Sequence, residues 1–111
     1  MQTRLNGLAW TADVSDTKWR EVRYEVHVHG VTMNPNSREV MWYSRCLGAF
    51  GREADRDTYF NAWTDDELQQ AIKYADILAN LDLDQKGREK ASSGLERLRS
   101  TTQRRAKIFD S

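Results

Sequence analysis

Residues 64–83 read TDDELQQAIKYADILANLDL, and this stretch combines a helix start signal, a helical period and the length of one long helix. The hydroxyl of Thr64 can accept a proton from an amide of the first turn, and Glu67 completes a capping box three residues later. The apolar residues recur at the spacing of one helical face: Leu68, Ala71, Ile72, Ala75, Leu78 and Ala79. A stripe of this width needs an apolar partner surface, which the rest of the chain must supply.

The composition is that of one small domain: 111 residues, of which 39% are hydrophobic and 31% charged. A chain of this size can bury a modest core, and this balance excludes the class of disordered proteins with few apolar residues. The single cysteine, Cys46, excludes an internal disulfide and a zinc site built from several thiolates. No apolar run reaches membrane-spanning length, and residues 1–10 lack the layout of a signal peptide, so we expect a cytoplasmic protein.

The formal net charge of zero conceals a division of charge along the chain. Residues 1–84 contain 9 basic and 14 acidic side chains, a net of −5, whereas residues 85–111 contain 8 basic and 3 acidic side chains, a net of +5. Such a division suits a charged partner, and it equally suits a basic C-terminal segment that docks on its own acidic half.

Ahead of the capped helix, the sequence predicts three antiparallel strands. Residues 5–14 are the first candidate, and residues 15–17 carry a turn signal after it. Residues 19–29 alternate apolar and polar side chains, which is typical of a half-buried strand. Residues 38–47 then return as the third strand after a proline-containing turn at residues 34–37.

A turn closed at residues 34–37 sets the register of the second and third strands. The pairs it predicts are Val28 with Tyr43, Gly30 with Met41 and Tyr24 with Leu47 on the apolar face, and His29 with Trp42 and Glu25 with Cys46 on the polar face. The same register places Arg45 opposite Val26, on the apolar side. A β-bulge or an edge position would relieve this inconsistency.

The predicted fold class is α+β, in a single domain covering residues 1–111. A three-stranded antiparallel meander occupies about 4–47, and a loop or short element follows at 48–63. In it, residues 50–59 are expected to form a loop or a short helical turn, and residues 58–63 a short fourth strand or a lead-in to the cap of the next helix. The capped amphipathic helix covers about 65–81 and is expected to lie across the apolar face of the meander. Asp84 can cap a second, basic helix at about 85–109.

The motif E-V-H-V-H at residues 25–29 is the candidate metal site. A strand places the imidazoles of His27 and His29 on one face about 7 Å apart, with Glu25 beside them. Cys46 falls on the same face, diagonal to His27, but diagonal strand neighbours lie too far apart for a Cys–His nucleophile, so an ordinary semi-buried thiol is expected. Zinc usually draws its ligands from more than one element, and these are the only two histidines in the chain. We therefore predict no metal, no cofactor and no catalytic residue, with a small metal-dependent enzyme using His27 and His29 as the third alternative.

Two charged sets and one aromatic residue are the candidate contact residues. The acidic set lies around the start of the capped helix and consists of Asp55, Asp57, Asp65 and Asp66. The basic set lies in the C-terminal helix and consists of Arg97, Arg99, Arg104, Arg105 and Lys107. Basic side chains of this kind can contact phosphates. Trp42, on the polar strand face, is the candidate aromatic anchor of an interface.

Without a catalytic set, the sequence favours a non-enzymatic macromolecule-binding protein, a small inhibitor or regulator acting through protein–protein contacts. Small inhibitors encoded by phages or mobile elements often have such a composition. The expected partner is another protein or a protein–nucleic-acid complex rather than a membrane, and a homodimer could form through the C-terminal helix. The second alternative is a nucleic-acid-binding regulator that uses this basic helix.

Overall fold

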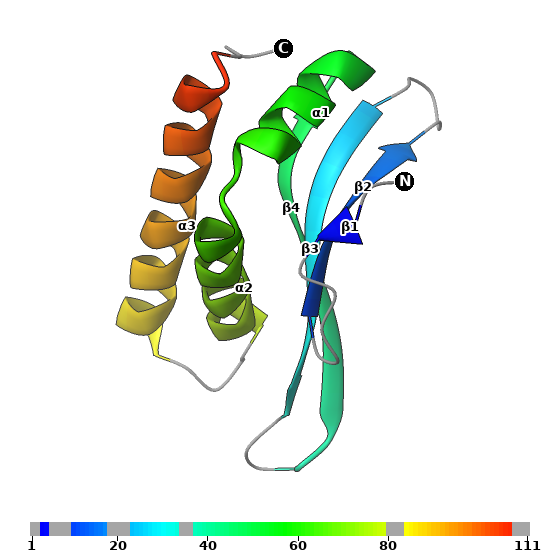
Figure 1. Ribbon diagram of the computed structural model, residues 1–111. Coiled ribbons are helices and arrows are strands. Elements are labelled where there is room, and N and C mark those ends of the chain that lie inside the picture. Colours follow the sequence, from blue (N-terminus) through cyan, green and yellow to red (C-terminus); the bar gives the residue numbers. More distant parts are fainter. Residues whose placement is uncertain (1–2, 5–9, 18–22, 34–36, 80–83, 108–111) are drawn as a thin grey trace.

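The computed structural model describes residues 3–4, 10–17, 23–33, 37–79 and 84–107. In chain order their elements are β1 (Thr3–Arg4), β2 (Trp10–Thr17), β3 (Arg23–Met33), β4 (Val40–Phe50), α1 (Glu53–Ala62), α2 (Asp65–Ala79) and α3 (Gln85–Arg105). The strands form one antiparallel sheet, α1 and α2 cover one of its faces, and α3 packs against both helices (Figure 1). The predicted α+β class is confirmed.

Neighbouring strands follow the chain order, β1-β2-β3-β4, so β1 and β4 are the two edges of the described sheet. The predicted turn at residues 15–17 is wrong, because these residues belong to β2, where Asp16 pairs with Tyr24. The ladder to β3 satisfies the backbone groups of this segment and outweighs the local turn preference of its polar side chains. The parts of the predicted strands at 5–9 and 19–22 lie outside the described residues.

The ladder between β3 and β4 differs in register from the prediction. Val28 faces Arg45 rather than Tyr43, because the last pair joins Met33 to Val40 and the connection between them is longer than the predicted turn. The other corrected pairs are Tyr24 with Phe50, Glu25 with Ala49, His27 with Cys46, His29 with Ser44 and Gly30 with Tyr43. In the outer part of the hairpin the shift is two residues, which leaves each side chain on its predicted face.

A β-bulge interrupts this ladder between Val26 and His27, with Leu47 as the extra residue on β4. The Leu47 side chain is fully buried in the core. Arg45 lies next to the bulge on the edge strand, where its side chain is exposed. An arginine on a sheet edge also disfavours pairing with a further chain.

Residues 48–63, predicted as a loop or short element with a candidate strand at 58–63, instead complete β4 and form helix α1. The reason is visible in the spacing of the residues that α1 and its C-cap bury, which are Arg56, Tyr59, Phe60 and Trp63. These positions are i, i+3, i+4 and i+7, one face of a helix rather than the alternation of a strand.

Helix α2 begins with the predicted capping box. The Glu67 amide donates to Thr64 Oγ1 at 3.1 Å, and the Thr64 amide donates to Glu67 Oε1 at 3.0 Å. The apolar stripe of α2 faces β3 and β4 and forms the centre of the core. The core cluster comprises Val26, Val28, Leu47, Phe50, Tyr59, Phe60, Trp63, Leu68, Ala71, Ile72, Ala75 and Leu95.

Helix α3 begins at its predicted cap, where Asp84 Oδ1 accepts from the Gly87 amide at 2.8 Å. Its buried residues are Ala91, Leu95 and Thr102, which follow a helical spacing of four and seven residues. Residues 108–109 of the predicted helix lie outside the described residues. Gly94 has a packing role, because a Cβ there would collide with the ring of Tyr74 on α2.

Candidate functional site

Within the described part of the chain, the helices lie on one face of β3 and β4 and none covers the opposite face. Side chains alternate along a strand, so the residues between the core positions of β3 and β4 share this outer face. They are Glu25, His27, His29, Val31 and Met33 on β3, and Val40, Trp42, Ser44 and Cys46 on β4. The outer face therefore holds both the candidate metal ligands and the candidate aromatic anchor.

An apolar patch occupies the far end of the β3–β4 hairpin, which projects beyond the helices (Figure 1). Met33 and Val40 form the last cross-strand pair, and Trp42 lies two residues further along β4, opposite Val31. The exposed fractions are 79% for Trp42, 59% for Met33 and 57% for Val40. We call Met33, Val40 and Trp42 the hairpin patch. These three apolar side chains are exposed, and no helix in the described ranges lies over them.

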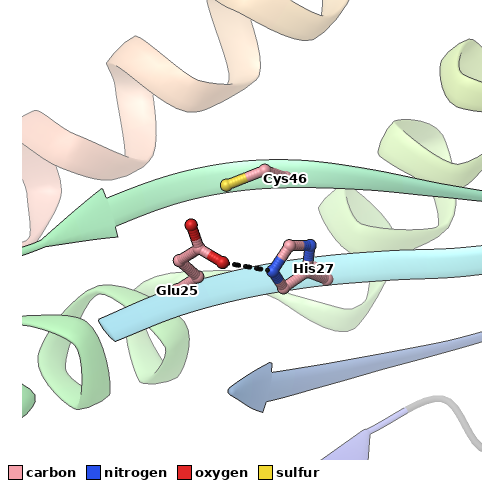
Figure 2. Close-up of side chains that lie close together, drawn as sticks. All are labelled: Glu25, His27 and Cys46. Atoms are coloured by element: carbon pink, nitrogen blue, oxygen red, sulfur yellow. Dashed lines mark hydrogen bonds and ion pairs between the residues drawn. The ribbon is translucent and has the colours of Figure 1, made fainter. Parts of the chain in front are cut away.

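A second group lies nearer the bulge on the same face. The ligand atoms of Glu25, His27 and Cys46 all lie within 4.8 Å of one another, and no other such group of three His, Cys, Asp or Glu side chains occurs among the described residues. The Glu25 carboxylate and the His27 ring point toward each other, with Cys46 on the adjacent strand (Figure 2). His27 Nε2 lies 3.0 Å from Glu25 Oε2, and His27 Nδ1 is buried without a hydrogen-bond partner.

The register explains why this cluster differs from the predicted E-V-H-V-H site. Cys46 lies directly opposite His27, not opposite Glu25, so a ligand atom from a second strand joins the pair. His29 stays on the same face, and its ring stacks on the His27 ring with centroids 5.9 Å apart, but it is outside the cluster of three.

The Cys46 thiol is not activated as a nucleophile. Burial raises its pKa, and the neighbouring Glu25 carboxylate raises it further. The thiol donates to the Gly48 carbonyl at 3.4 Å. A protonated thiol is a poor nucleophile, so this environment gives no support to a Cys–His catalytic pair.

The structure does not bring the acidic candidates together into one site. Asp55 and Asp57 lie on α1, and Asp57 Oδ1 accepts from Arg56 Nε at 3.1 Å. Asp65 and Asp66 open α2, and Asp65 forms an ion pair of 2.7 Å with Arg4. The positive end of the helix dipole, at the first turns of α1 and α2, and the two ion pairs account for these carboxylates locally. Asp66 is exposed at the helix start.

The basic candidates fall into two groups. Arg99 donates to the Leu47 carbonyl at 2.8 Å, and Arg105 binds Glu67 through two bonds of 2.7 and 2.9 Å. The hydrogen bonds from Arg105, followed by those with Thr64, lower the pKa of Glu67 from 4.5 to about 2. The remaining members, Arg97, Arg104 and Lys107, are exposed. Part of the basic helix thus docks on the acidic half of the same chain.

A small cavity lies between the bulge and α3, lined by residues that include Leu47, Tyr59 and Arg99. Its volume is about 130 Å³. Pockets for drug-sized ligands measure roughly 300–1,000 Å³, so this cavity is too small for such a ligand. The outer face of the hairpin remains the better candidate site.

Comparison with known proteins adds no functional information, because no family model, no curated protein and no solved structure matches this chain. Among the described residues, no helix is both long and apolar enough to cross a membrane. Met33 and Val40 were not among the contact residues predicted from the sequence. Met33 continues the alternation of His27 and His29 on β3, and Val40 that of Trp42 on β4, which is the signal that could have identified them.

Proposed function

We propose that this chain is a non-enzymatic, cytoplasmic binding protein that docks on a partner protein through the hairpin patch. The observation that carries the proposal is the joint exposure of Trp42, Met33 and Val40 on one face of a projecting hairpin. Contiguous apolar side chains at the surface of a small domain mark interaction sites more often than chance exposure does. A small inhibitor or regulator of another protein is the class of function that this surface suits.

Trp42 is the expected centre of the interface. A tryptophan buries about 150–250 Å² when it is covered, and truncating such an anchor costs roughly 2 kcal/mol or more of binding free energy. Met33 and Val40 lie beside it and would exclude water from its contact. The histidines and Ser44 on the same face would supply a polar rim.

The test is affinity capture from a lysate of the cells that make the protein, followed by measurement with the purified partner. The bait proteins are the wild type, Trp42→Ala, and Lys73→Ala as a control on the exposed side of α2. We expect one protein to be captured by the wild type and by Lys73→Ala. The captured protein should bind Trp42→Ala at least about 30-fold more weakly than it binds the wild type, which corresponds to about 2 kcal/mol of binding free energy.

Trp42→Ala should fold normally, because substitutions of exposed residues usually change stability by no more than about 0.5 kcal/mol. Circular dichroism and thermal unfolding check this directly. Equal capture by the wild type and Trp42→Ala would exclude the hairpin patch as the binding surface. If the captured protein is a second copy of this chain, the hairpin patch mediates self-association instead. Ultracentrifugation of the purified protein would detect such a dimer.

The basic helix is the second candidate, for a nucleic-acid partner. Arg97 and Arg104 are exposed on α3, but Arg99 and Arg105 are engaged within the fold, so fewer phosphate contacts are available than the sequence predicts. A gel shift with single- and double-stranded DNA at low salt tests it, with Arg97→Gln/Arg104→Gln as the variant. A salt-sensitive shift that this variant abolishes would favour the nucleic-acid function.

A further inference from the structure

We propose that Glu25, His27 and Cys46 form a binding site for a zinc ion on the outer face of the sheet. The three side chains come from two adjacent strands, β3 and β4, and their ligand atoms lie within 4.8 Å of one another (Figure 2). The bulge at Leu47 and the resulting pairing of His27 with Cys46 create this arrangement. The site is distinct from the hairpin patch and does not depend on the proposed protein partner.

The distances require only small side-chain movements. Tetrahedral zinc holds sulfur at about 2.3 Å and nitrogen or oxygen at about 2.0–2.2 Å, which separates neighbouring ligand atoms by roughly 3.3–3.6 Å. His27 Nε2 and Glu25 Oε2 are already 3.0 Å apart, and no pair in the cluster exceeds 4.8 Å. Rotamer adjustments can close the remaining gap, because no helix of the described residues packs over this face of the sheet.

The ligand types select the metal. A thiolate and an imidazole bind zinc far better than they bind magnesium or calcium, which prefer oxygen ligands. The charges also balance, since a Zn²⁺ ion with one thiolate and one carboxylate has no net charge. This neutrality suits a partly buried site, where an uncompensated charge would be costly. With three protein ligands, the fourth position would be filled by water from the exposed side of Cys46.

Zinc binding releases the proton of the Cys46 thiol to the solvent as the Zn–S bond forms. The His27 ring binds through Nε2, which lies 3.0 Å from Glu25 Oε2. No oxidation or reduction takes part. Glu25, Arg99 and Arg23 are the charged groups that act on the thiol among the described residues.

The experiment uses the full chain, reduced and freed of metal with a chelator. Zinc chloride is titrated by calorimetry in buffers of different ionisation enthalpy, and cobalt(II) is added in parallel as a spectroscopic probe. We expect one zinc per chain, one proton released, a thiolate-to-cobalt charge-transfer band in the near ultraviolet, and a higher unfolding temperature with zinc. A wild-type protein that shows no zinc binding, or no charge-transfer band with cobalt, overturns the proposal.

Variants distinguish zinc binding by Glu25, His27 and Cys46 from zinc binding by the pair His27 and His29. Cys46→Ala, His27→Gln and Glu25→Gln each remove one ligand, whereas His29→Gln is the matched control on the same face. Substituting a residue that only supports a metal ligand already weakens metal binding by about 10–100-fold. Each ligand variant should therefore lose at least about tenfold in zinc affinity, whereas His29→Gln should bind zinc as the wild type does. Binding that survives Cys46→Ala, or that is lost in His29→Gln, would assign the metal to the two histidines instead.

Discussion

The Leu47 carbonyl at the bulge offers a precise test of how the sheet and helices are joined. The bulge removes Leu47 from the ladder with β3, and its carbonyl oxygen accepts from the Tyr59 hydroxyl at 2.7 Å and from Arg99 Nε at 2.8 Å. Burial raises the pKa of Tyr59 to about 12, so the hydroxyl remains a donor across the ordinary pH range. One oxygen thus links β4 to α1 and to α3.

Removing one of the two donors leaves the Leu47 carbonyl with the other, so each single substitution should lower the free energy of unfolding only slightly. Tyr59→Phe keeps the ring that packs on Phe50, and Arg99→Met keeps most of the aliphatic stem. Each should cost about 1 kcal/mol of the free energy of unfolding, the usual net value of one hydrogen bond. The double variant leaves a carbonyl near the core with neither donor, which adds a desolvation cost of about 1–3 kcal/mol. The double variant should therefore lose more than the sum of the singles.

The assay is urea unfolding of the wild type, both single variants and the double variant under identical conditions, analysed as a double-mutant cycle. We expect a coupling energy of at least about 1 kcal/mol. Additivity to within about 0.5 kcal/mol would refute the reasoning, because it would mean that the two donors do not share one acceptor. Lys73→Ala, on the exposed side of α2, is a control that should not couple to Tyr59→Phe.

Two further predictions concern the helix junction and the hairpin. Because the folded-state pKa of Glu67 is lowered to about 2, its bond to Arg105 stabilises the fold above about pH 4.5 and this contribution is lost as the pH falls toward 2. In urea titrations at pH 7, Arg105→Gln should therefore have a lower free energy of unfolding than the wild type. At pH 2 the two proteins should have almost the same free energy of unfolding. A difference that is equal at both pH values would contradict this reasoning. Gly30→Ala should lower the unfolding temperature, because its Cβ would occupy the position of the Tyr43 ring, and pairing it with Tyr43→Ala should recover part of the loss.

Local features of the chain were predictable because they depend on residues a few positions apart. The capping box of α2, its buried stripe and the Asp84 cap of α3 occur where the sequence predicts them. Helix α1 carried a comparable signal in the spacing of Arg56, Tyr59, Phe60 and Trp63, which the polar composition around it concealed. The outer face of the hairpin was also readable, since alternation along a strand survives a register shift of two.

Tertiary structure alone decided the features that depend on distant residues. The register of β3 and β4 follows from the length of their connection and from the bulge at Leu47, and only this register places Cys46 opposite His27. Likewise, Arg99 and Arg105 belong to the same basic set of candidate contact residues as Arg97. The packing of α3 turns Arg99 toward the Leu47 carbonyl and Arg105 toward Glu67. Capping and periodicity are satisfied within a helix turn, whereas a ladder pair or a long-range ion pair exists only once the chain has brought its two partners together.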